Sequence, residues 1–207
     1  MTMKTEVNPL ETSRSEAFSL WITSPMPMVT LTKTFEISNL LKASKKYGIK
    51  TNALLCWCIG KAAYKIEEFF LLPEKDKLFK YDRLAINVIV KNCKGGINSC
   101  DIPFSDSIKT FADDYISLTL QAASECKSSF LEDYMIVGTS AMIETELDCI
   151  VNQYTDKFNN PMLMWGKYRK KWFKTLLPIS FQFHHSQMDG GHAASFLSLL
   201  QNEIKNL

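Results

Sequence analysis

The stretch Leu177–His192 constrains the fold of this sequence more than any other part of it. Apolar and polar residues alternate along its first half, which is the two-residue period of a β-strand with one apolar face. Beyond it apolar residues recur at helical spacing, after the Gly190-Gly191 pair that permits a sharp turn. The stretch therefore predicts a strand that ends near His184, followed at once by a helix with Asp189 as its N-cap.

All three histidines of the chain lie in this junction, at positions 184, 185 and 192. Histidine is the side chain whose ordinary pKa lets it act as an acid or a base near neutral pH. Strand alternation predicts that His185 points to the buried side with Phe181 and Phe183, and that His184 points with Gln182.

Three interpretations of His185 follow from the residues alone. The first is a core histidine beside a helix cap. The second is a general base in a dry pocket, with Asp189 fixing the local geometry or charge. The third is a metal site, because His185, Asp189 and His192 have i, i+4, i+7 spacing. Gly190-Gly191 argues against the continuous helix that this site needs, and no cysteine pair has ligand spacing. No metal is therefore predicted.

The string His184–Gly190 (HHSQMDG) matches the HHxxxDG signature of the chloramphenicol acetyltransferase family, a group of coenzyme-A-dependent acyltransferases. Arg14–Phe18 resembles the family's RxExF helix start, and Ser140 lies in a stretch that resembles its serine strand. Phe158–Pro161 and Gly166–Tyr168 resemble the segment that leads into the last strands. These similarities follow the family's order along nearly the whole chain.

The resemblance implies specific catalytic roles. His185 is the general base that deprotonates an acceptor hydroxyl, and Ser140 donates a hydrogen bond to the tetrahedral intermediate. Asp189 pairs with Arg14 in a structural ion pair. Acetyl transfer from a thioester requires both a base and stabilisation of the oxyanion. On residue pattern alone, Arg14 is a solvated helix residue and Ser140 an ordinary strand hydroxyl.

The most basic run of the chain, Lys167–Trp172, combines four cations with aromatic residues. Cations bind phosphates and aromatic rings stack on bases, which suits coenzyme A, although a solvated strand end is the alternative. The family's coenzyme contacts include the matching lysine–tyrosine pair. The resemblance therefore predicts that Lys167 and Tyr168 bind acetyl-CoA, the co-substrate.

Phe18 and Trp21 are the predicted substrate-binding residues. Trp21 stands where drug-acetylating members of the family have a tyrosine, and indole cannot accept a hydrogen bond. Ile143-Glu144 replace the Pro-Trp that follows the serine in many members. The resemblance predicts an acetyl-CoA-dependent O-acetyltransferase of the chloramphenicol type, acting on a small-molecule hydroxyl acceptor. The alternatives are an acetyltransferase for another hydroxyl or amine, and a non-catalytic ligand-binding protein with this fold.

The composition is that of a soluble globular protein, with 207 residues, 46% apolar and 22% charged. A net charge of +2 gives no indication of a nucleic-acid or anionic-membrane partner. Met1–Asn8 lacks the apolar core of a signal peptide, and no apolar run approaches the roughly 20 residues of a membrane span. Six scattered cysteines favour reduced thiols over a disulfide framework. We therefore expect one cytoplasmic acyltransferase domain over residues 1–207.

Local patterns predict the order of helices and strands. The capping box Ser13–Glu16 predicts a helix from Ser13. Further helices are expected over 38–46, over 51–69 and after Ser107; the expected strands are 28–36, 84–90, 97–102, 135–142, 162–170 and 175–184. The strands over 84–90 and 97–102 bracket Cys93–Gly96 and are expected to form a hairpin. This order predicts an α/β fold with a mixed sheet and helices on one face. The resemblance implies a two-layer sandwich with a mostly antiparallel sheet, a homotrimer with active sites between subunits, and a role in antibiotic resistance.

Overall fold

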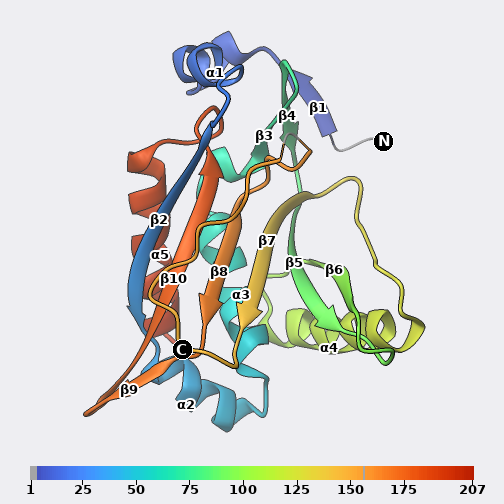
Figure 1. Cartoon of the computed structure of the whole chain (residues 1–207), viewed down its shortest axis with the longest axis vertical. Coiled ribbons are helices and arrows are strands. Elements are labelled where there is room, and N and C mark those ends of the chain that lie inside the picture. The colour runs from blue at the N-terminus through green and yellow to red at the C-terminus, as the bar shows by residue number, and fades with distance from the viewer. Residues whose placement is uncertain (1–3, 156) are drawn as a thin grey trace.

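One large mixed sheet carries the fold in the computed structural model, which describes residues 4–155 and 157–207. Its strands lie in the order β2-β10-β8-β7-β5-β6, and the short β9 pairs with β10 (Figure 1). The strands are β2 (Met28–Glu36), β5 (Leu84–Lys91), β6 (Ile97–Pro103), β7 (Met135–Met142), β8 (Met162–Gly166), β9 (Arg169–Lys171) and β10 (Lys174–His184).

The pairing within this sheet is mostly antiparallel. Only β8 with β7 and β7 with β5 run parallel, whereas β10 is antiparallel to β2, β8 and β9, and β5 is antiparallel to β6. The predicted mixed sheet is therefore confirmed. The predicted hairpin of β5 with β6 is confirmed as well.

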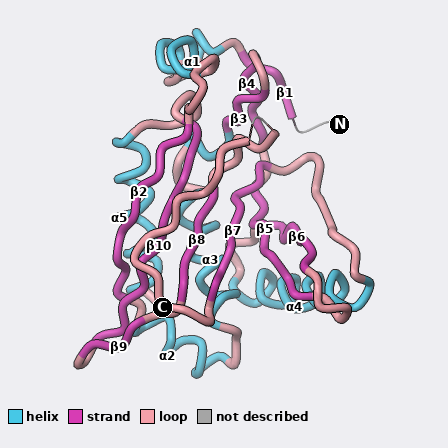
Figure 2. The backbone as a smooth tube through the Cα atoms, viewed as in Figure 1, coloured by secondary structure: helices cyan, strands magenta, loops and turns pink. Residues whose placement is uncertain are grey.

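Helices cover one face of the sheet. In Figure 2, α3 (Thr51–Ala63) and α5 (Gly190–Lys205) lie behind the strands, α2 (Ser38–Tyr47) lies at their lower ends, and α4 (Ile108–Glu125) lies beside β5 and β6. Helix α3 is buried along most of its length, as its apolar sequence requires. Phe69, Phe181 and Phe196 join the layers, with ring centroids 4.7–5.9 Å apart. The predicted two-layer architecture is confirmed.

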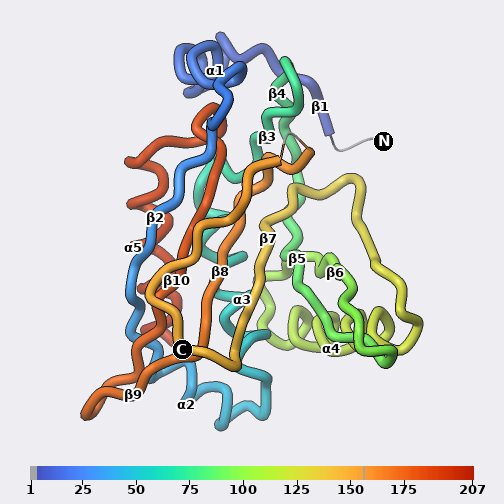
Figure 3. Tube along the Cα trace, viewed as in Figure 1, coloured from blue at the N-terminus to red at the C-terminus, as the bar shows by residue number. Residues whose placement is uncertain are grey.

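The opposite face of β10 is also buried, which corrects the prediction of a strand with one apolar side. Residues 143–155 and 157–161 cross this face between β7 and β8 (Figure 3). The N–H of Ile150 donates to Ser180 Oγ at 2.8 Å, and Gln182 Nε2 donates to the carbonyl of Asn152 at 3.1 Å. Ser180 and Gln182 are therefore paired inside the protein and do not face solvent.

A second, three-stranded sheet was not predicted. It contains β1 (Lys4–Val7), β4 (Lys77–Tyr81) and β3 (Leu71–Glu74) in that order, and it lies at the end of the molecule that carries α1 (Ser15–Trp21) (Figure 1). Phe18, Leu71 and Leu78 form a separate small hydrophobic core there. Two 3-10 helices, η1 (Pro9–Glu11) and η2 (Glu67–Phe70), flank this region.

Two predicted helix boundaries were wrong. Helix α1 begins at Ser15 without a side-chain cap, because Ser13 Oγ donates to Glu68 Oε1 at 2.7 Å instead of capping. Helix α3 ends at Ala63, not at Phe69, and the chain re-forms as η2. The break lets Glu68 reach Ser13 while Phe69 enters the main core, so tertiary contacts override local helix preference.

The predicted strand over 162–170 divides into β8 and β9. The division falls after Gly166, where an added Cβ would lie 2.7 Å from the carbonyl oxygen of Thr145. The next N–H, that of Lys167, donates to the same carbonyl at 2.7 Å. Lys167 and Tyr168 therefore lie in an irregular segment between two strands.

All six cysteines carry free thiols in this structure. Among residues 4–155 and 157–207, no helix combines the length and the apolar character that crossing a membrane would require.

Candidate active site

The predicted junction is present, since β10 ends at His184 and α5 begins at Gly190. Asp189 is the N-cap of α5, as predicted, because its Oδ1 accepts from the N–H groups of Gly191 at 2.9 Å and His192 at 3.3 Å. His192 Nδ1 in turn accepts from the N–H of Asp189 at 3.3 Å, which completes a capping box. We call residues 185–189 the catalytic turn.

His185 opens the catalytic turn and is partly exposed, in contrast to the buried position that strand alternation predicted. Its ring stacks on Trp21, with centroids 4.6 Å apart and planes at 11°. Its Nδ1 lies 3.3 Å from the carbonyl oxygen of Met188. A proton on Nδ1 satisfies that carbonyl, so we assign this tautomer, and Nε2 is then free to accept a proton.

His184 is the buried histidine of the pair, with 1% of its surface exposed. Its Nδ1 accepts from the N–H of Ser186 at 3.1 Å. Burial, together with the neighbouring His185, lowers the pKa of His184 to about 4. The side chain is therefore neutral near pH 7 and acts as an internal support of the catalytic turn.

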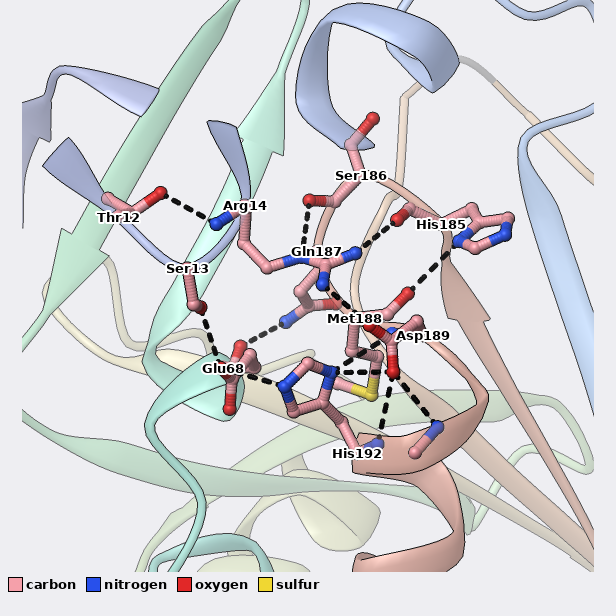
Figure 4. A network of polar contacts seen from close by, with 11 residues as sticks. Thr12, Ser13, Arg14, Glu68, His185, Ser186, Gln187, Met188, Asp189 and His192 are labelled. Carbon is pink, nitrogen blue, oxygen red and sulfur yellow. Dashed lines mark hydrogen bonds and ion pairs between the residues drawn. The ribbon is translucent and has the colours of Figure 1, made fainter. Parts of the chain in front are cut away.

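Arg14 binds the catalytic turn from the N-terminal segment, as Figure 4 shows. Its Nη1 donates to Asp189 Oδ2 at 3.0 Å, so the predicted Arg14–Asp189 ion pair is present. The same guanidinium donates to the carbonyl oxygens of His185 at 2.9 Å and Ser186 at 3.3 Å. Only 2% of Arg14 is exposed. A fully buried cation thus fixes the main chain of the candidate base.

The ionisation of Asp189 fits this arrangement. Burial tends to raise its pKa, but hydrogen bonds from Arg14 and from the N–H groups of His192 and Gly191 outweigh that effect, and the pKa is lowered. Asp189 is therefore a carboxylate at neutral pH, which keeps the buried guanidinium paired.

The two predicted substrate-binding residues occupy different surroundings. Trp21 lies against the imidazole of His185 and is 37% exposed. Phe18 is only 7% exposed and packs in the small core with Leu71 and Leu78. Trp21 thus lies beside the candidate base, whereas the substrate role of Phe18 stays a prediction.

Ser140 does not lie beside His185 in the same chain. Strand register places Ser140 opposite Met164 on β8, and Met164 opposite Ser180 on β10. Ser180 precedes His185 by five positions, which is about 16 Å along a strand, and two strand spacings add about 10 Å across the sheet. One chain therefore contains both predicted catalytic residues without bringing them together.

Lys167 and Tyr168 line a cavity of about 530 Å³ between the start of α3 and the end of β8. Lys50, the N-cap of α3, lines the same cavity with Thr51 and Asn52. The N-terminus of a helix attracts anions, and two ammonium groups add to that attraction. The cavity is therefore suited to a phosphate-bearing ligand. Lys50 was missed from the sequence, although a lysine just before an apolar helix was a readable signal.

The rest of the basic run has other surroundings. Arg169 is paired with Glu146 at 3.2 Å and Asp148 at 2.7 Å, so its charge is already balanced. Trp172 and Phe173 form the exposed tip of the hairpin between β9 and β10. Only the first two residues of the run thus line the cavity.

The sequence model of the family described as Chloramphenicol acetyltransferase matches residues 4–201. The chain belongs to the chloramphenicol acetyltransferase family. It is therefore a member of a family of acyltransferases.

Individual relatives are distant. Chloramphenicol acetyltransferase 3 of Escherichia coli is 24% identical over 178 residues, which is 83% of each chain. A solved chloramphenicol acetyltransferase superimposes with a TM-score of 0.85 at 20% identity, over 98% of this chain and 100% of that one. A probable dihydrolipoamide acetyltransferase from Listeria monocytogenes has a TM-score of 0.71 at 12% identity, over 97% and 93%. At such identities the solved structures establish the fold alone.

Two further residues of this chloramphenicol acetyltransferase family member lie at its candidate sites. Trp21 stacks on His185 and brings no hydroxyl there. Ile143 lines the same cavity as Lys167. Among the described residues, no group of three or more histidine, cysteine or acidic side chains could hold a metal ion.

Proposed function

We propose that the protein is an acetyl-CoA-dependent O-acetyltransferase in which His185 is the general base. The observation that carries this proposal is the restraint on His185. Its ring stacks on Trp21, its Nδ1 faces the Met188 carbonyl, and its own carbonyl accepts from Arg14. A base held in this way presents Nε2 in one direction, which is the orientation that proton transfer in a transition state requires.

The chemistry follows from these groups. Nε2 of His185 takes the proton of an acceptor hydroxyl as its oxygen attacks the thioester carbonyl. Ser140 donates a hydrogen bond to the oxyanion of the tetrahedral intermediate. When the carbon–sulfur bond breaks, the imidazolium returns its proton to the departing thiolate. The acetyl group ends on the acceptor oxygen, and free coenzyme A leaves.

We place the phosphates of acetyl-CoA in the cavity of Lys50 and Lys167, with Tyr168 available for stacking on adenine. Two ammonium groups and the N-terminus of α3 supply positive charge where the phosphates need it. This arrangement supports Lys167 and Tyr168 as coenzyme contacts and adds Lys50 to them.

We also propose a homotrimer with its active sites between subunits. Ser140 and His185 are separated within one chain by the strand register described above. A shared active site therefore needs His185 from one copy and Ser140 from a neighbour, which a cyclic assembly provides.

The second candidate is an acetyltransferase for a different hydroxyl or amine acceptor. Trp21 favours it, because a bulky indole without a hydrogen-bond acceptor lies against the base where drug-acetylating relatives have tyrosine. Chloramphenicol can be the acceptor only if it fits beside Trp21. A role in antibiotic resistance depends on the same fit.

One assay separates these readings. The protein is mixed with acetyl-CoA and a panel of acceptors, and release of the coenzyme A thiol is followed. We expect turnover with at least one hydroxyl acceptor; turnover on chloramphenicol selects the first candidate, and turnover only on others selects the second. No thiol release across a broad panel would reject both candidates in favour of a ligand-binding protein.

A further inference from the structure

Two side chains without an assigned role, Glu68 and His192, are linked to the Arg14–Asp189 pair that holds the catalytic turn. Glu68 belongs to η2, and its side chain is about 10% exposed. His192 lies in the first turn of α5. Figure 4 shows His192 beside Asp189 and Glu68 on the far side of the His192 ring, away from His185. The sequence drew attention to His192 only as a possible metal ligand.

The contacts form a closed ring. Arg14 pairs with Asp189 at 3.0 Å, and the main-chain N–H of Asp189 donates to His192 Nδ1 at 3.3 Å. His192 Nε2 lies 3.1 Å from Glu68 Oε1, and the same oxygen accepts from Ser13 Oγ at 2.7 Å. Ser13 precedes Arg14 in the chain, so the circuit returns to its start. We call these five residues the polar ring.

Each member of the polar ring restricts the next. His192 Nδ1 accepts from the N–H of Asp189, so Nε2 is the nitrogen that donates to Glu68. Glu68 thereby sets the tautomer and orientation of His192, and His192 holds the main chain of Asp189. Asp189 then orients the Arg14 guanidinium, which donates to the carbonyl of His185.

We propose that Glu68 and His192 are positioning residues that keep Arg14, and through it the base His185, in the productive arrangement. The inference rests on the proposed function, because it assigns the ring's purpose to that base. A displacement of about 1 Å at a reacting group can lower a rate about a hundredfold, so a network three contacts away matters.

The test compares Glu68→Gln and His192→Gln with Glu203→Gln. Glu203 is a similarly buried carboxylate on α5, but it pairs with Lys65 and lies outside the polar ring. We expect each ring variant to lower kcat roughly ten- to hundredfold. The KM for acetyl-CoA should change by less than about twofold, because the coenzyme cavity is elsewhere. Glu203→Gln should lose thermal stability and keep its kcat.

The double variant Glu68→Gln/His192→Gln separates a shared role from two independent ones. Members of one ring should give a combined loss close to the larger single loss. A loss equal to the product of the two single losses would overturn the inference. Ser13→Ala opens the ring with a smaller change, and it decides the matter if Glu68→Gln does not fold: a fall in kcat in the same direction supports the ring, and an unchanged kcat opposes it.

A second measurement needs no acceptor. The Cε1–H resonance of His185, one of only three histidines, should shift in both ring variants and stay in place in Glu203→Gln. Unshifted resonances would overturn the inference even in an active enzyme. Shifted resonances in a protein without acetyl transfer would uphold the ring and reject the proposed function, so the two failures are distinguishable.

Discussion

At the scale of single residues, the two adjacent histidines have different surroundings and different proposed roles. His184 is sealed in the interior with an uncharged ring, and His185 is restrained but accessible. Adjacent residues at a strand end point in different directions, which places one imidazole in the core and the other at the turn. Each assignment predicts a different effect of substitution.

His185→Ala should lower the rate of acetyl transfer by about two to four orders of magnitude, the usual contribution of a general base. The measurement is thiol release at saturating acetyl-CoA, with circular dichroism to confirm folding. His184→Asn, which keeps an acceptor near the Nδ1 position, is the matched comparison. A loss below about tenfold in His185→Ala would exclude this residue as the base.

His184 should make the stability of the protein depend on pH. Burial holds its folded-state pKa at about 4, whereas the unfolded chain takes up the proton near pH 6.5. Stability is therefore complete above pH 6.5 and is lost as the pH falls toward 4, by roughly 3 kcal/mol. Urea unfolding at several pH values should show this slope in the wild type and a smaller one in His184→Asn. Equal slopes in both proteins would contradict the assignment.

At the scale of elements, the proposed coenzyme cavity lies where α3 begins and β8 ends. Helix α3 starts beside the break between β8 and β9, and this brings Lys50 to Lys167 across more than a hundred positions of sequence. In the proposed site, the basic run therefore contributes Lys167 and Tyr168, and Lys50 comes from outside the run.

Lys50→Ala and Lys167→Ala should each raise the KM for acetyl-CoA roughly ten- to a hundredfold, because each removes one charge-assisted contact to phosphate, worth about 1.5–3 kcal/mol. Lys171→Ala removes a charge from the same run but outside the cavity, so its KM should match the wild type. Steady-state kinetics with varied acetyl-CoA measures all three. Equal effects of the three substitutions would indicate a general electrostatic attraction instead of a defined site.

Sequence patterns were sufficient for the elements whose own residues determine them. The β5–β6 hairpin, β7 and the Asp189 cap follow from alternation, turn residues and capping chemistry. Local patterns failed where distant contacts decide. The helix expected to reach Phe69 ends earlier, and this lets Glu68 accept a hydrogen bond from Ser13, fifty-five positions away. The burial of Gln182 depends on a crossing segment that no local pattern reveals.

The candidate site shows the same division. Resemblance supplied the Arg14–Asp189 pair, and the structure contains it. Glu68 and His192 carry no comparable signature, because their importance lies in a ring closed by tertiary contacts. Lys50 had a readable signal, its position just before an apolar helix, but only the fold shows that it lines the same cavity as Lys167.

At the scale of the whole molecule, the chain forms two hydrophobic cores and separates its predicted catalytic residues. That residues 1–207 form one acyltransferase domain stays a prediction, as does the trimer. The distance between Ser140 and His185 makes the trimer directly testable, because each copy then depends on its neighbour.

Co-expression of His185→Ala chains with Ser140→Trp chains should restore activity that neither has alone. Random mixing in a cyclic assembly leaves about a quarter of the interfaces with both native residues, so about a quarter of the wild-type rate is expected. Chains that carry both substitutions are the control, since they should restore nothing when mixed with either single variant. Inactive mixtures from assemblies shown to be mixed would place the active site within one chain.

The contact between Arg14 and the catalytic turn can form only late in the synthesis of the chain. Arg14 reaches His185 across 171 positions and Asp189 across 175. At 5–20 residues per second, roughly ten to thirty seconds of translation separate the two ends of this ion pair. Until α5 has been translated, a ribosome-bound chain therefore carries its Arg14 guanidinium without its Asp189 partner. The proposed active site can mature only after β10 and α5 have left the exit tunnel.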